Sequence, residues 1–87
     1  MKCLPLYFYK VESLDVEGNE YYSTFNIFTL KEQSFNDQPA IVYPNYKLIW
    51  KDGLGEHHRD YNKPAVIYLR MGKMVYYEHG WLRKTKQ

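Results

Sequence analysis

The second half of the chain contains one hairpin-sized segment twice. Residues 39–43 read Pro-Ala-Ile-Val-Tyr, and 25 residues later residues 64–68 read Pro-Ala-Val-Ile-Tyr. A turn follows each copy, and then a lysine, two apolar residues and an aromatic residue, at 47–50 and at 73–76. A repeat of this length indicates a unit that cannot bury its own apolar face, so that neighbouring units must stack. The sequence therefore predicts an architecture of stacked β-hairpins.

The rest of the chain fits one small antiparallel sheet of the all-β class with about six strands. Residues 31–38 form a polar connector with room for one short helical turn. Pro39 and Pro64 suit the first residue of a strand, where the missing N–H is tolerated. The expected strands cover residues 6–13, 20–30, 39–43, 46–51, 64–69 and 73–78.

These 87 residues are expected to form a single domain (1–87). Within it we distinguish an N-terminal strand pair (1–35), two hairpin repeats (36–83) and a basic tail (84–87) that is expected to be frayed. Short, flat strands leave unpaired sheet edges, so a homodimer is left open beside a monomer.

The second repeat junction matches a known pattern. His58-Arg59-Asp60 is followed, after three residues, by Pro-Ala-Val-Ile-Tyr. This resembles the MORN-like "HRxDGPA" repeats, β-hairpin repeats of many bacteriophage, giant-virus and bacterial proteins. The resemblance covers about residues 36–83, although the first junction lacks the His-Arg pair and both junctions lack the glycine before proline. It implies stacked antiparallel hairpins and a viral or mobile-element setting, but no shared chemistry.

The cysteine content and the apolar segments of the sequence indicate the cellular compartment. Cys3 is the only cysteine, so no internal disulfide forms. The N-terminus does not read as a signal peptide, and no segment approaches the length of a membrane span. We expect a reduced protein of the cytoplasm, the host cytoplasm if it is viral, without membrane contact.

Charge is distributed unevenly along the chain. Residues 1–43 hold three lysines and six acids, a net charge of −3, whereas residues 44–87 hold nine Lys or Arg and four acids, a net charge of +5. Either the two halves attract one another within the fold or between subunits, or the basic half faces an acidic partner.

The His-Arg element has a structural interpretation. Arg59 can stack on a neighbouring aromatic ring and bind Asp60 or a carbonyl, and His58 can donate to a turn carbonyl. The alternative is a metal site built from His57, His58, His79 and Glu56 or Glu78. Adjacent histidines on an extended chain point to opposite sides, so we expect no metal.

Catalysis and cofactors are not expected. The chain has no G-x-S-x-G, P-loop or G-x-G-x-x-G motif, and no helix follows the Gly53-x-Gly55 turn to bind a phosphate. No catalytic residue, enzyme activity or cofactor is assigned.

A small non-enzymatic protein-binding module is the leading interpretation. Its surface would carry tyrosines and tryptophans beside positive charge and dock on a host or defence protein complex, modulating or inhibiting it. Two alternatives are nucleic-acid binding through Lys47, Lys51, Arg70, Lys73, Arg83 and Lys84, and a structural, self-assembling viral protein. For Trp50, burial in the core is the competing interpretation. The candidate partner-binding residues are Trp50, Arg59, Tyr61, Arg70, Tyr77, Trp81 and Arg83.

Overall fold

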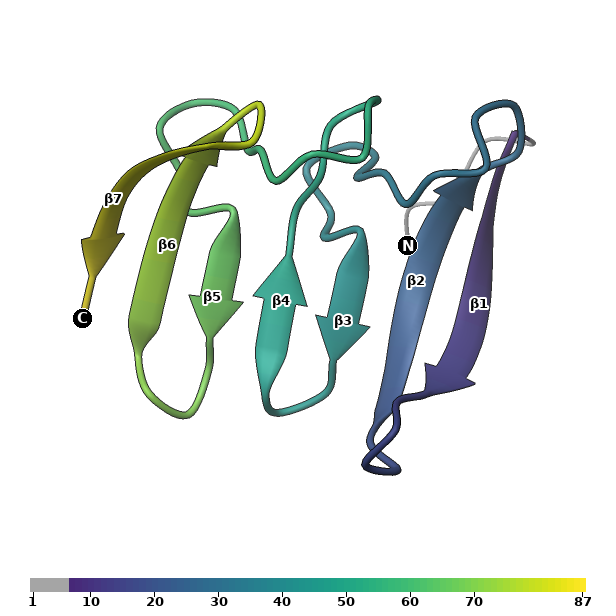
Figure 1. Cartoon of the computed structure of the whole chain (residues 1–87), viewed down its shortest axis with the longest axis horizontal. Coiled ribbons are helices and arrows are strands. Elements are labelled where there is room, and N and C mark those ends of the chain that lie inside the picture. Colours follow the sequence, from purple (N-terminus) through teal and green to yellow (C-terminus); the bar gives the residue numbers. More distant parts are fainter. Residues whose placement is uncertain (1–6) are drawn as a thin grey trace.

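The computed structural model describes residues 7–87 as one open antiparallel sheet whose seven strands follow one another in chain order (Figure 1). No helix occurs in this range, so the prediction of an all-β stack of hairpins is confirmed. It follows that no helix here is long and apolar enough to span a membrane. The strands are β1 (Phe8–Leu14), β2 (Glu20–Asn26), β3 (Ile41–Tyr43), β4 (Lys47–Ile49), β5 (Val66–Tyr68), β6 (Lys73–Glu78) and β7 (Trp81–Lys86).

The two sequence repeats become the hairpins β3–β4 and β5–β6, with matching backbone bonds. The N–H of Ala40 donates to Ile49, and the N–H of Ala65 donates to Val75. Both alanines are almost fully buried, at 1% and 0% exposure. The hairpin turns hold Asn45 and Gly72 at positive φ, the conformation that asparagine and glycine adopt most readily.

One face of the sheet carries the core. The register places Ile41, Ile49, Val66 and Val75 side by side across β3 to β6, and all four are buried. The tyrosines at 21, 43, 68 and 77 pack against this row. Each buried aliphatic side chain contributes about 2 kcal/mol through loss of apolar surface from water.

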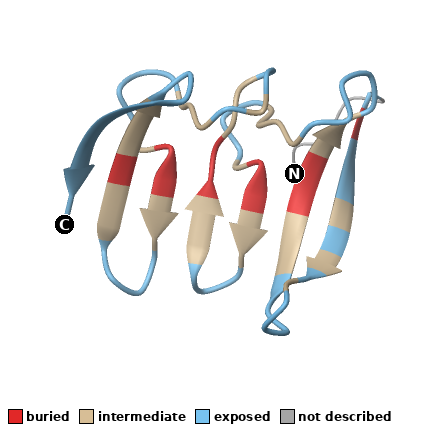
Figure 2. Ribbon diagram, in the orientation of Figure 1, coloured by how far each residue is buried: buried red, intermediate tan, exposed pale blue. Residues whose placement is uncertain are grey.

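Two long crossovers meet the sheet at one end. Residues 27–40 join β2 to β3 and residues 50–65 join β4 to β5, both at the sheet end opposite the turns of the β1–β2, β3–β4 and β5–β6 hairpins (Figure 1). The buried parts of β3, β4 and β5 lie toward that end (Figure 2). The core therefore concentrates where the crossovers meet the sheet.

The C-terminal tail corrects the sequence prediction. Residues 84–87 were expected to be frayed, but β7 reaches Lys86 and pairs with β6. The sheet therefore has seven strands where about six were predicted. A turn at His79 and Gly80, with φ of 46° and 87°, reverses the chain after β6. Every residue of β7 is exposed, so neither of its faces needs apolar residues. Its sequence therefore lacks the alternation of apolar and polar residues from which a strand is predicted.

Other boundaries also differ from expectation. The repeat strands are three residues long where five or six were predicted, except for β6. The connector 31–38 forms no helical turn; it makes isolated bridges between Phe25 and Glu32 and between Phe35 and Gln38. The predicted start of the first strand at Leu6, and Cys3, lie outside the described residues.

Replacing Ile49 tests which face carries the core. Ile49→Ala should lower the free energy of unfolding by about 3 kcal/mol, because it opens a cavity in the buried row. The matched variant Ile67→Ala removes the same atoms from a half-buried side chain on the other face and should cost clearly less. Urea unfolding measures both; a larger loss for Ile67→Ala would contradict this assignment.

Candidate functional site

Arg59 joins the two crossovers. Its Nε and Nη2 donate to the two carboxylate oxygens of Asp37 at 3.0 and 3.2 Å, and its Nη1 donates to the carbonyl of Pro64 at 3.3 Å. The guanidinium lies 3.8 Å from the ring centroid of Trp50. This confirms the expectation that Arg59 stacks on an aromatic ring and binds a carbonyl, with Asp37 in place of Asp60 as the carboxylate.

Asp37 is held in its ionised form. The hydrogen bonds from Arg59, together with Lys63 at 2.9 Å, outweigh partial burial and lower the pKa of Asp37 to about 2. Its backbone carbonyl accepts the indole N–H of Trp50 at 3.0 Å. One aspartate thus ties the first repeat junction to the second through an ion pair and a hydrogen bond.

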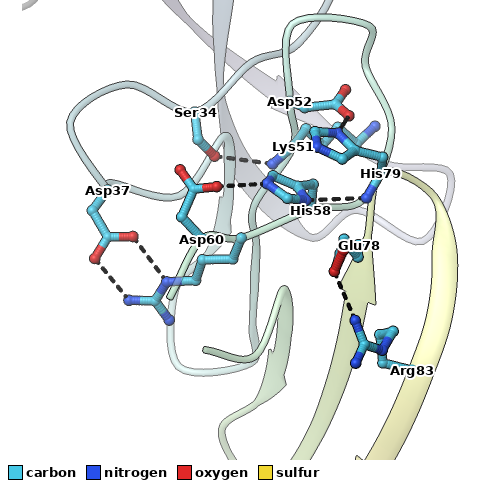
Figure 3. A network of polar contacts seen from close by, with 10 residues as sticks. Ser34, Asp37, Lys51, Asp52, His58, Asp60, Glu78, His79 and Arg83 are labelled. Atoms are coloured by element: carbon cyan, nitrogen blue, oxygen red, sulfur yellow. Dashed lines mark hydrogen bonds and ion pairs between the residues drawn. The ribbon is translucent and has the colours of Figure 1, made fainter. Parts of the chain in front are cut away.

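A second polar cluster surrounds two histidines (Figure 3). The Nδ1 of His58 accepts the backbone N–H of His79 at 3.0 Å, which assigns the proton to Nε2, and Nε2 donates to Asp60 at 2.7 Å. The two imidazoles stack with centroids 3.8 Å apart. His58 therefore binds a backbone N–H and Asp60, and not the turn carbonyl that was expected.

Asp52 anchors the other histidine. Its Oδ2 lies 2.7 Å from the Nδ1 of His79, and this hydrogen bond raises the pKa of His79. Burial opposes ionisation of Asp52, but the bonds from His79 and from the N–H groups of Glu56 and Leu54 outweigh it and lower the pKa of Asp52. The β6–β7 turn is thereby tied to the second crossover.

His57 points away from this cluster, as expected for neighbours on an extended chain. Its ring stacks on Tyr77 with centroids 4.9 Å apart. Burial lowers the pKa of His57, and Lys51 and Lys47 lower it further. The neutral form is the one that this packing favours.

Asp52, Glu56 and His79 are the residues with the potential to hold a metal. One ligand atom from each lies within 4.8 Å of the others. The oxygens of Asp52 already accept two backbone N–H groups and His79, so a cation would have to displace the proton shared with that imidazole. The contacts seen are those of a hydrogen-bonded turn.

A surface hollow of about 560 Å³ lies between the second crossover and the strands β6 and β7. Tyr61 at its rim is 87% exposed, with φ of 63°. Arg83 enters it from β7 and pairs with Glu78 at 2.7 Å (Figure 3). We call this region the crossover hollow; its other aromatic lining residues are Tyr76 and Tyr77.

The candidate partner-binding residues fall into three groups. Arg59, Tyr61, Tyr77 and Arg83 all line the crossover hollow, and Trp81 lies nearby at the start of β7, 78% exposed. Trp50 is only 4% exposed, beneath Arg59, so it is core and offers almost no surface to a partner. Arg70 lies at the other end of the sheet, where it donates to the carbonyl of Asn45.

Asp37 and Asp52 are the contributors that sequence reasoning missed. Asp37 sits in the junction that lacks the His-Arg pair, and its signal was the sequence Asn-Asp two residues before proline. Asp52 precedes glycine in a turn, where aspartate commonly caps backbone N–H groups. Neither position reveals its side-chain partner from the sequence alone.

No family model matches the chain, and no curated protein and no solved structure is found to be similar to it. The resemblance to MORN-like repeats stays a prediction. The hairpin stack that it implied is present in the sheet.

Replacing Arg59 tests the link between crossovers. Arg59→Lys keeps the charge but loses the planar group that lies on Trp50 and binds both Asp37 oxygens. It should lower the free energy of unfolding by about 1–2 kcal/mol, measured in urea. The control Arg70→Lys removes one exposed hydrogen bond and should change it by less than about 0.5 kcal/mol. Equal losses would contradict the role of Arg59.

The His79–Asp52 pair predicts a pH dependence. Because folding raises the pKa of His79, its contribution is fully present below the unfolded pKa and is lost as pH rises through the folded pKa. As pH rises from about 6 to about 8, the free energy of unfolding should fall more in the wild type than in Asp52→Asn, which lacks the carboxylate that raises the pKa of His79. His57 is present in both proteins, so its contribution cancels in this comparison. NMR titration should show the pKa of His79 falling in this variant; no change would refute the pairing.

Proposed function

We propose that the chain is a protein-binding module without catalytic activity of its own, which docks through the crossover hollow and the adjoining β7. The main observation behind this proposal is that one hollow is lined by residues from separate segments of the sequence, among them Tyr61, Tyr77 and Arg83. Trp81 and Leu82, 78% and 61% exposed, extend this surface along β7. Aromatic and arginine side chains contribute most of the energy of protein interfaces.

The backbone at Tyr61 supports this interpretation. A non-glycine residue at positive φ carries a conformational cost of about 1 kcal/mol, and packing normally compensates it. Tyr61 is 87% exposed and so gains little from packing within the chain. A large ring held outward at such a cost is typical of a binding residue.

The polar groups around the hollow favour binding over catalysis. His58 binds Asp60, Arg83 binds Glu78, and Arg59 binds Asp37. These three side chains are engaged with acidic partners, and no serine, threonine or cysteine nucleophile is among the described residues that line the hollow, although His79 keeps its Nε2 beyond the bond to Asp52. This supports the proposal that the protein is not an enzyme.

The nucleic-acid alternative has weaker support. Three of its lysines lie over tyrosine rings: Lys47 is 5.1 Å from the Tyr43 centroid, Lys73 is 5.9 Å from that of Tyr68, and Lys84 is 4.6 Å from that of Tyr76. Lys51 is paired with Glu32 at 3.0 Å. Arg83 is likewise paired with Glu78, so acids within the fold neutralise two of the six cations that this alternative needs for phosphate. It stays a prediction that the partner is a host or defence complex. The viral source, the cytoplasmic location and self-assembly also stay predictions.

Two alanine variants test the docking surface. Tyr61→Ala and Trp81→Ala remove exposed rings, so each should fold normally yet weaken partner binding about 30-fold, the equivalent of about 2 kcal/mol. Crosslinking and capture from source-cell extract, followed by titration of the purified partner, measure the loss. The control Phe28→Ala removes a ring that is 78% exposed, like that of Trp81, from the first crossover, beside Tyr7 and outside the crossover hollow. Undiminished binding by all three variants would refute the proposal.

A further inference from the structure

The outer edge of β7 is open. Strand β7 (Trp81–Lys86) pairs with β6 on one side, with a bulge at Arg83 where the register shifts, and within residues 7–87 no segment pairs with the other side. All six residues are exposed. An edge strand directs the N–H and C=O groups of alternate residues outward, where an extended peptide can bind them.

The register sorts the side chains of β7 onto two faces. Lys84 is opposite Tyr76 and Lys86 is opposite Met74, which places both ammonium groups on one face. Thr85 is opposite Val75 and so lies on the face that carries the core. The Nζ of Lys84 is 4.6 Å from the Tyr76 ring centroid. The edge thus has a cationic face, and on its other face Thr85 lies beside the end of the buried row.

Charge decides which strand fits this edge. β7 contains Arg83, Lys84 and Lys86 and no acid. Arg83 is paired with Glu78, while Lys84 and Lys86 make no ion pair among the described residues. A second copy, pairing β7 with β7, would bring these cations together, and like charges on adjacent strands are destabilising. The same cations favour an acidic strand, so the edge discriminates between the two.

We propose that β7 binds an extended acidic segment of the partner protein as an eighth strand. Carboxylates at every second position of that segment face Lys84 and Lys86, and β-branched or aromatic residues between them extend the core face beside Thr85. This rests on the proposed function, whose surface includes β7. Backbone pairing to the edge also separates a peptide from a polynucleotide, which has no peptide groups to pair.

Two dye-labelled peptides of the same composition test the pattern. One alternates glutamate and valine, and the other groups the same residues into a glutamate block and a valine block. Fluorescence anisotropy should show the alternating peptide binding at least about tenfold more tightly, since only it matches both faces. The double variant Lys84→Glu/Lys86→Glu should lose about tenfold or more of this affinity. The control Lys10→Glu/Lys31→Glu makes the same change in net charge at exposed sites elsewhere and should retain it.

Amide hydrogen exchange, followed by NMR, separates strand addition from simple charge attraction. The alternating peptide should slow exchange of the outward-facing amides of β7 about tenfold or more. Equal binding of both peptides without protection of β7 would overturn the proposal. So would tighter binding of single-stranded oligothymidylate at β7, or a dimer in light scattering whose β7 amides are protected before any peptide is added.

Failure of this inference is distinguishable from failure of the proposed function. If Tyr61→Ala and Trp81→Ala weaken capture of the partner while neither peptide protects β7, the docking surface stands and strand addition is wrong. If the alternating peptide protects β7 while those variants capture the partner as well as wild type, the edge binds acidic strands and the proposed docking surface is wrong.

Discussion

The fold depends on the contact between Arg59 and Asp37 above Trp50. A sheet of one layer has no opposing sheet or helix to exclude water, so its core must be closed by the loops that cross its end. Loops carry polar backbone groups that need partners when buried. Arg59 supplies one of these partners, to the Pro64 carbonyl; it also covers the Trp50 ring with its planar face and binds the carboxylate of Asp37 with its edge. A polar crossover thereby shields the apolar ring of Trp50 from water.

The imperfect sequence repeat has a physical reason. In both units the Pro-Ala step is buried and bonds to the neighbouring strand in the same way. The junctions differ because they bind each other: the second supplies the guanidinium of Arg59 and the first supplies the carboxylate of Asp37. The positions equivalent to His58 and Arg59, 25 residues earlier, are Gln33 and Ser34, so the first unit lacks the pair. It contributes Asp37 to the contact instead, and the two adjacent junctions are complementary in charge.

The architecture was largely predictable, and the site only in part. Alternating β-formers, prolines before the repeat strands and Gly72 in a hairpin turn all depend on local chemistry, which the sequence contains. Strand β7 was missed because Trp81–Lys86 are exposed on both faces and show no alternation. The burial of Trp50 and the partner of Arg59 were open because they depend on which loops meet across the sheet. The crossover hollow forms from segments that lie apart in the sequence, so composition could supply its residue types but not their grouping.

The uneven distribution of charge along the chain has two consequences in the structure. Glu32 pairs with Lys51, and Asp37 pairs with Arg59 and Lys63, so acids of the first half hold bases of the second within the fold. This supports attraction between the halves, one of the two explanations considered from the sequence. Lys84 and Lys86 are among the bases that form no ion pair within the described residues, and both lie on β7, one of the two edge strands. Lysines on an edge strand keep copies of a protein from pairing with one another. Positive charge on β7 therefore opposes self-association without covering the edge, and this is the property that the proposed binding of a partner strand requires.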